Sequence, residues 1–114
     1  MNRDRKKLID RLVEENSSCV VDNGVEVRSF YGRGVSDLYR LLTEEPEFLT
    51  GAFIADKVVG RGAATLMILG GVSAVFARVI STPALEFFRT YGIEVEYAVE
   101  VPHIINRQGS DWCP

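Results

Sequence analysis

The chain has 114 residues, of which 46% are hydrophobic and 25% are charged, and its formal net charge at pH 7 is −3. This length supports one hydrophobic core but is too short for two, and the composition is that of a globular protein. The acidic balance excludes a broad positive surface for nucleic acid, so we expect a single domain over residues 1–114 and no nucleic-acid partner.

The first predicted elements are a helix and a β-hairpin. Apolar residues recur along one stripe of residues 3–15, as in an amphipathic helix. Two β-rich runs follow within residues 19–29, and Asn23-Gly24 between them favours the positive φ values of a tight primed turn. A second helix is predicted over residues 35–43.

The middle of the chain, "GAFIADKVVGRGAATLMILGG", combines apolar and small residues with three charges. We expect residues 51–55 to form a buried strand and Asp56 to cap the next helix, because a carboxylate accepts the free N–H groups of a first turn. That helix is predicted over residues 57–69 and ends at Gly70-Gly71. A β-branched and aromatic run then predicts a strand over residues 72–80.

The last part of the chain contains a further helix and strand. "STPALEFFRTYG" has the signals of a helix that is capped by Thr82 and ends at Gly92. Residues 93–101 follow a strict period of two, with larger apolar residues on one face and Glu94, Glu96, Ala98 and Glu100 on the other, which predicts a strand near a sheet edge with one buried face. Residues 102–114 lack periodicity and are predicted to be a loop that packs on the domain.

The order of elements indicates an α/β fold. Strands alternate with helices in the second half, which favours parallel strands joined by right-handed crossovers. An antiparallel hairpin that leads into a parallel half predicts a mixed sheet of about five strands in a three-layer α-β-α arrangement.

One run has the beginning of a dinucleotide-binding fingerprint. In "VVGRGAAT", residues 58–65, Thr65 stands where a third glycine or alanine is needed. On the predicted boundaries, Gly60 and Gly62 also lie inside a helix rather than in the turn before it. We therefore interpret the small residues of this run as a smooth helix face that packs closely on the sheet.

The sequence does not favour a metal site. Zinc needs three or four Cys, His or carboxylate ligands at suitable spacing. The chain has one histidine, His103, two cysteines, Cys19 and Cys113, and no CxxC or HxE motif. We expect no metal and no cofactor.

Three features indicate a soluble cytoplasmic protein. No apolar run reaches the roughly 18 residues of a membrane span, so no membrane association is expected. Charges begin at Arg3, where a secretory signal would need an apolar segment. Two widely separated cysteines do not form a disulfide framework, which is consistent with a reducing compartment.

A small-molecule site is predicted where two helices begin. Asp56, Lys57 and Arg61 cluster at the start of one predicted helix. Ser81 and Thr82 precede the free N–H groups of the next. Both starts are expected at the carboxyl ends of adjacent strands, where α/β sheets bind ligands.

Three segments of the chain resemble an uncharacterised prokaryotic family, the domain of unknown function 1893. They are "GAFIADKVVGRGAATLMILGGV", "VISTPALEFFRTYGIEVEY" and "VPHIINRQGSDWCP". The family is assigned to the cytidine-deaminase-like fold, so the resemblance implies that fold for this chain.

The same resemblance implies that deaminase chemistry is absent. Zinc deaminases place a His- or Cys-Ala-Glu motif at one helix start and Pro-Cys-x-x-Cys at the next. On this resemblance the first start reads Ala55-Asp56-Lys57, and Ala84 and Phe87 stand at both cysteine positions of the second. The resemblance therefore implies a deaminase scaffold without the zinc ligands.

The C-terminal segment has two interpretations. If it folds back over the two helix starts, four of its residues would join the expected site: Asn106, Arg107, Asp111 and Cys113. Alternatively, it only covers the core.

Three functions follow from these observations. The preferred one is non-catalytic binding of a nucleotide- or nucleoside-like molecule at the remnant of the deaminase cavity. The second is an enzyme of different chemistry that uses Cys113 or Asp56. The third is an interaction module that forms a homodimer through its last strand or C-terminal segment.

Overall fold

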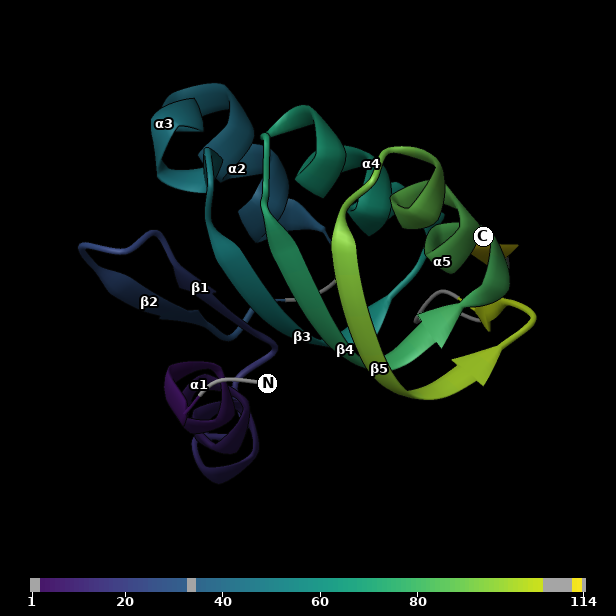
Figure 1. The fold of residues 1–114 in the computed structure, drawn as a ribbon, viewed down its shortest axis with the longest axis horizontal. Helices are drawn as coiled ribbons and strands as arrows, with labels where there is room; N and C mark the ends of the chain where they lie inside the picture. Colours follow the sequence, from purple (N-terminus) through teal and green to yellow (C-terminus); the bar gives the residue numbers. More distant parts are fainter. Residues whose placement is uncertain (1–2, 33–34, 106–111, 114) are drawn as a thin grey trace.

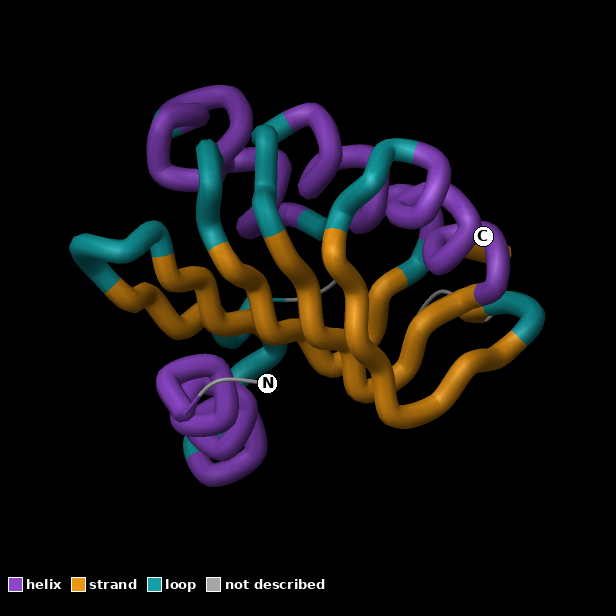
Figure 2. The backbone as a smooth tube through the Cα atoms, in the orientation of Figure 1, coloured by secondary structure: helices purple, strands orange, loops and turns teal. Residues whose placement is uncertain are grey.

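A computed structural model of the chain describes residues 3–32, 35–105 and 112–113 (Figures 1 and 2). The helices are α1 (Arg3–Glu14), α2 (Ser36–Glu44), α3 (Pro46–Leu49), α4 (Arg61–Leu69) and α5 (Thr82–Thr90). The strands are β1 (Cys19–Asp22), β2 (Val27–Phe30), β3 (Phe53–Val59), β4 (Ala74–Ser81), β5 (Glu94–Val101), β6 (Ile104–Ile105) and β7 (Trp112–Cys113). Within these ranges, no helix combines the length and the apolar character that crossing a membrane requires.

Five strands form a mixed sheet in the order β2-β1-β3-β4-β5. β1 runs antiparallel to β2 and β3, whereas β3, β4 and β5 are parallel to one another. Because parallel neighbours need a crossover, α4 connects β3 to β4 and α5 connects β4 to β5. The α/β fold with a mixed five-stranded sheet, predicted from the sequence, is confirmed.

Helices cover the two faces of the sheet unequally. In Figure 1, α1 lies on one face and α2, α3, α4 and α5 lie on the other. The larger core lies under these four helices and contains Ile54, Ala77 and Phe88. The smaller core, where α1 packs against β1 and β3, contains Leu12 and Val20.

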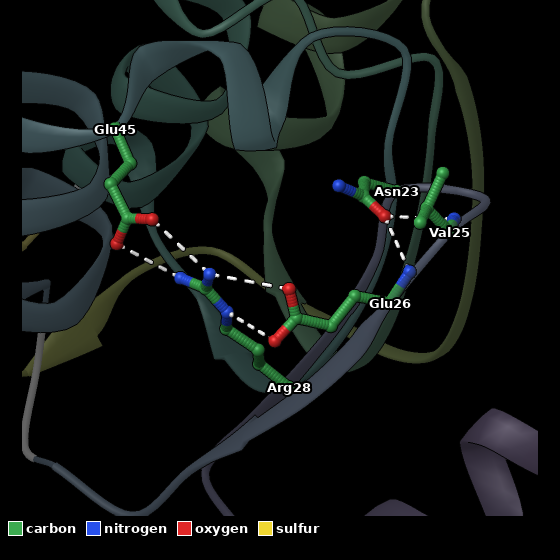
Figure 3. Close-up of polar contacts among 5 residues, drawn as sticks. All are labelled: Asn23, Val25, Glu26, Arg28 and Glu45. Atoms are coloured by element: carbon green, nitrogen blue, oxygen red, sulfur yellow. Dashed lines mark hydrogen bonds and ion pairs between the residues drawn. The ribbon is translucent and has the colours of Figure 1, made fainter.

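The hairpin between β1 and β2 is present, but its turn differs from the predicted one. Asp22 pairs with Val27, so four residues connect the strands, and Asn23 does not adopt a positive φ. Instead, the side-chain oxygen of Asn23 accepts hydrogen bonds from the N–H groups of Val25 and Glu26 at 2.9 and 2.8 Å (Figure 3). The asparagine therefore acts through its side chain, which offers the loop a hydrogen bond that a two-residue turn does not need.

The predicted boundary between β3 and α4 is wrong. β3 continues through Asp56 and Lys57 to Val59, and α4 begins only at Arg61, after Gly60. Asp56 is therefore not a helix cap. The reason is tertiary, because β1 and β4 flank this part of β3 and hydrogen-bond to its backbone. A polar residue that signals a cap locally is held in a strand by its neighbours.

The start of α5 is shifted by one residue from the prediction. Ser81 is the N-cap, and its hydroxyl accepts a hydrogen bond from the N–H of Ala84 at 3.2 Å. Thr82 is the first residue of the helix. Serine and threonine are both common N-cap residues, and serine, the more favoured of the two, takes the position here.

The last part of the chain differs from the prediction in two ways. β5 is an edge strand as expected, but its apolar residues do not share one buried face: Tyr97 pairs with the core residue Ala77, Val99 pairs with Val79 on the other side, and the two are 37% and 51% exposed. The segment predicted to be a loop contains a short antiparallel ladder, in which Ile104 pairs with Cys113 and Ile105 with Trp112.

Arg28 ties the hairpin to the helical layer. Its guanidinium donates to both carboxylate oxygens of Glu45 at 2.9 and 3.1 Å and also contacts the carboxylate of Glu26 (Figure 3). The same guanidinium lies 4.0 Å from the ring centroid of the buried Phe48. Because Arg28 comes from β2 and Glu45 joins α2 to α3, this contact fixes the edge of the sheet against the first two helices of the layer.

We expect Arg28→Gln to raise the pKa of Glu45, since hydrogen bonds from Arg28 hold that pKa below its ordinary value. A lowered folded-state pKa stabilises the fold at neutral pH, and this contribution is lost as pH falls through the folded pKa. The stability difference between wild type and Arg28→Gln should therefore shrink in acid. Carboxyl NMR titration measures the pKa of Glu45, and urea unfolding measures the stability difference.

The control is Arg89→Gln, an exposed change on α5, which should alter neither quantity. An unchanged Glu45 titration in Arg28→Gln would contradict the contact.

Candidate functional site

The starts of α4 and α5 lie side by side at one edge of the sheet. They follow β3 and β4, which are adjacent parallel strands, and the two helices pack against each other. Arg61 at the start of α4 is exposed, and its guanidinium carbon lies 5.7 Å from the ring centroid of Phe87 in α5. The fold thus brings Arg61, Ser81 and Thr82 to the carboxyl edge, where α/β sheets commonly bind ligands.

The two hydroxyl groups at the start of α5 are already engaged. Ser81 is fully buried and caps the helix. The hydroxyl of Thr82 donates to Glu100 at 2.7 Å and lies 3.3 Å from the carbonyl oxygen of Val101. Ser81 thus closes the first turn of α5 and Thr82 ties that turn to β5, so both hydroxyl groups are poorly placed to be the first contacts of a ligand.

Asp56 and Lys57, predicted to act together, lie on opposite faces of the sheet. Asp56 pairs in register with Cys19 and Ala77, which belong to the core under α2–α5. Register partners share a face, so the carboxyl of Asp56 lies on that side and is 9% exposed. Lys57 is partly exposed, and its ammonium donates to the side-chain oxygen of Asn16 just after α1.

Asp56 is a buried carboxyl group without a cationic partner. Burial raises its pKa from 3.8 to about 7, although hydrogen bonds from the N–H groups of Val58 and Lys57 act in the opposite direction. No residue in the described part of the chain forms an ion pair with it. Near neutral pH this group is therefore both an acid and a base, and its protonated form can donate as well as accept a hydrogen bond.

Two further groups lie near Asp56 at the start of β1. The thiol of Cys19 is buried, and its pKa is raised well above 9.0 by burial and by the negative charges of Asp56 and Asp37. It is thus a protonated thiol and not a thiolate nucleophile. The hydroxyl of Ser17 is fully buried and has no hydrogen-bond partner within the described protein. Because β1 is antiparallel to β3, its start lies beside the carboxyl end of β3.

The regular alternation of side chains along β3 is interrupted next to Asp56. The Oδ1 of Asp56 accepts a hydrogen bond from the N–H of Val58, two residues on, at 3.3 Å. Ile54 and Val59 pack in the same core although they are five residues apart, and residues at odd separation face opposite sides of a regular strand. The same shift occurs in β4, where Ala77 and Ile80 share that core. Such interruptions re-aim side chains and are common beside functional sites.

The prediction that Gly60 and Gly62 lie inside a helix is wrong. Gly60 is the N-cap of α4 and Gly62 is in its first turn, so both lie at the strand-to-helix junction and not deep inside a helix. Ala63 and Ala64 are buried and pack closely as predicted, whereas Gly62 is exposed. The fingerprint still lacks its third small residue, because Thr65 occupies that position.

The position that the deaminase resemblance gave to the first helix start is also wrong. Ala55-Asp56-Lys57 lies within β3 and is not the start of a helix. Ala84 and Phe87 do lie in the first two turns of α5. Among the residues that the structure describes, no group of three His, Cys, Asp or Glu side chains could hold a metal ion.

Four predicted site residues belong to the C-terminal segment. Asn106, Arg107 and Asp111 lie outside the described residues. Cys113 is described only as part of the β7 backbone, so its side chain is not placed at the carboxyl edge. Their part in a site stays a prediction.

Sequence reasoning missed the contribution of β1 to this edge. Cys19 and Ser17 reach the neighbourhood of Asp56 only because β1 inserts between β2 and β3. Three consecutive residues of β1, Cys19, Val20 and Val21, are buried, so its apolar run predicts a strand covered on both faces but does not reveal which strand lies alongside.

Comparison with known proteins connects the chain to one family. The family model described as "Domain of unknown function (DUF1893)" matches residues 7–114. The crystal structure of a DUF1893 family protein (TM1506) from Thermotoga maritima is similar, with a TM-score of 0.84 and 21% sequence identity. That alignment covers 100% of this chain and 78% of the other and demonstrates a shared fold. None of the curated proteins compared with the chain matches it.

We expect Asp56→Asn to change the pH dependence of stability. Because the folded pKa is raised, ionisation of Asp56 opposes folding, and the destabilisation grows from about pH 4 to about pH 7. A shift from 3.8 to about 7 corresponds to about 4 kcal/mol, an upper limit for the effect. Asparagine stays neutral and can still accept the N–H of Val58, so urea unfolding should show the variant gaining stability relative to wild type as pH rises.

The control is Asp10→Asn, which removes a charge from an exposed position on α1. It should follow the pH profile of wild type. Parallel profiles for wild type and Asp56→Asn would show that Asp56 has an ordinary pKa and would overturn its assignment as a neutral-pH acid.

Proposed function

The chain belongs to the DUF1893 family, and we propose that it binds a small nucleoside- or nucleotide-like molecule at the carboxyl edge of β3 and β4 without catalysing a reaction. In this proposal the domain has a cytidine-deaminase-like scaffold that has lost its zinc site, and the ligand occupies the remnant of the deaminase cavity. The proposed binding residues are Asp56 in β3 and Arg61 and Gly62 at the start of α4, and Ser81 and Thr82 fix the start of α5 beside them.

Asp56 is the observation that carries the proposal. A carboxyl group with a pKa of about 7 provides a donor and an acceptor side by side when it is protonated. Nucleobase edges present donors and acceptors in the same way, and aspartate is a common partner of the amino group of cytosine. Ser17, two residues before the Cys19 that pairs with Asp56, adds a buried hydroxyl that has no hydrogen-bond partner within the described residues.

The start of α4 supports recognition of a phosphate. No side chain caps this helix, so the N–H groups of its first turn lack a capping partner there. Arg61 and Gly62 are exposed at this position, which combines backbone donors with a guanidinium. A nucleotide could therefore place its base toward Asp56 and its phosphate at the start of α4.

The two alternative functions gain no support from the described contacts. The enzyme hypothesis depends on Cys113, whose side chain is not described, or on Asp56 as an acid or base. The homodimer hypothesis depends on β5, which is at the sheet edge, or on the C-terminal segment, of which residues 106–111 and 114 lie outside the described residues. Three glutamates, Glu94, Glu96 and Glu100, line that strand and oppose the pairing of two copies along it.

The proposal is tested by ¹H–¹⁵N NMR titration with the four common ribonucleosides and their 5′-monophosphates. We expect at least one base to shift the signals of residues 56–64, with the monophosphate binding more tightly than its nucleoside. Wild-type affinity should fall as pH rises through about 7, because the protonated carboxyl is the binding form.

Two variants of Asp56 separate its roles. Asp56→Asn keeps a donor and an acceptor, so it should bind at all pH values, whereas Asp56→Ala should weaken binding about tenfold. Arg61→Gln should remove the advantage of the monophosphate, and Arg89→Gln serves as the charge control. If none of the eight compounds shifts these signals, or if Asp56→Ala binds as wild type does, the proposed function is wrong.

A further inference from the structure

A hollow lies on the face of the sheet opposite the proposed nucleotide site. Among the described elements, α1 alone lies on this face, where it packs against β1 and β3 (Figures 1 and 2). The hollow has a volume of about 270 Å³ and is lined by consecutive pairs of residues from β3, β4 and β5: Lys57 and Val58, Arg78 and Val79, and Ala98 and Val99.

The interruption of β3 explains how this hollow forms. In a regular strand, one residue of each pair would point to the other face. Asp56 and Val59 are buried on the α2–α5 side, so Lys57 and Val58 between them both turn toward the open face. The ladder is in register here, because Val58 pairs with Val79 and Val79 pairs with Val99. The result is a short apolar row across three strands.

Two cations lie next to this apolar row. Lys57 and Arg78 come from neighbouring strands and line the same hollow, and none of the six lining residues is acidic. Arg78 is exposed and forms no ion pair or hydrogen bond with another described residue. Like charges on adjacent strands repel, so an anion that bridges them would relieve an unfavourable contact.

The apolar walls of the hollow are also incompletely covered. Val58 and Val99 are 47% and 51% exposed, although a valine in a central strand such as β3 is ordinarily buried. A bound molecule with a short apolar part would cover both side chains. The volume is just below the range of roughly 300–1,000 Å³ that is typical of small-molecule pockets, which limits the occupant to a small metabolite.

We propose that this hollow is a binding site for a small amphipathic anion. Its carboxylate or phosphate group contacts Lys57 and Arg78, and its short apolar part packs on Val58, Val79 and Val99. Lys57 is already held in place by its hydrogen bond to Asn16, which reduces the cost of ordering it around the anion. The site is independent of the proposed nucleotide site, because the sheet separates the two.

A second copy of the chain fits this surface less well. Its acidic strand β5 is the element that could neutralise the cations, but two-fold pairing along β5 would bring Glu94, Glu96 and Glu100 of both copies to one seam. A small anion satisfies the cations without that repulsion.

The test is an NMR titration with hexanoate, hexyl phosphate, hexanamide and inorganic phosphate. We expect hexanoate or hexyl phosphate to shift the signals of the six lining residues, and the relative affinities of the two identify the preferred anion. Hexanamide lacks the charge and inorganic phosphate lacks the apolar part, so each should bind at least about tenfold more weakly. Added salt should weaken the binding.

Variants at exposed positions of the hollow keep the test independent of folding. Arg78→Gln should weaken binding about tenfold, and Val99→Glu, which places a carboxylate beside the cations, should abolish it. Arg89→Gln, an equal change in charge on α5, should bind as wild type does.

Three results would overturn the inference. One is equal binding of hexanoate and hexanamide. Another is an equal effect of Arg78→Gln and Arg89→Gln. The third is self-association, detected by light scattering, that shifts the lining residues without any added anion. None of these results bears on nucleotide binding at the carboxyl edge, so the two proposals fail separately.

Discussion

A break in side-chain alternation in β3, at the hydrogen bond from the N–H of Val58 to the carboxyl of Asp56, is the feature on which both candidate sites depend. It lies just before the strand gives way to α4, and β4 beside it has the same break. On the covered face it leaves a carboxyl group beside Cys19. On the open face it presents Lys57 and Val58 together. One local break in alternation therefore contributes to two surfaces that share no side chain.

Keeping Asp56 in this position has an energetic cost, because an ionised carboxyl loses its hydration when it is buried. The surrounding protein offers backbone N–H groups but no cation within the described residues. Structural carboxylates are usually paired, whereas groups with strongly perturbed pKa values concentrate at functional sites. This contrast distinguishes Asp56 from Glu45, whose charge is neutralised by Arg28 at the other side of the domain.

The asymmetry of the layers gives the two faces different roles. Four helices cover one face and seal a continuous core, so a ligand can enter there only at the edge where helices begin. The other face is covered by α1 over β1 and β3, and the surface beside it carries Lys57, the exposed Arg78 and the exposed valines Val58 and Val99. Arg28 and its carboxylate partners hold the hairpin edge to the helical layer, which keeps β1 between β2 and β3 and thus Cys19 next to Asp56.

The sequence by itself determined the kinds of elements and their order, because hydrophobic periodicity and turn residues act over a few neighbouring positions. It predicted the hairpin, the parallel half and the mixed five-stranded sheet, and it placed Arg61, Ser81 and Thr82 at the sheet edge where α4 and α5 begin. It could not determine where β3 ends. Asp56 has the local signature of a helix cap, and only pairing with β1 and β4 holds it in the strand. Tertiary structure also decided that Asp56 and Lys57 face opposite sides of the sheet and that Arg78 lines the same hollow as Lys57. These relations depend on which strands lie side by side, and packing across the whole domain selects the strand neighbours.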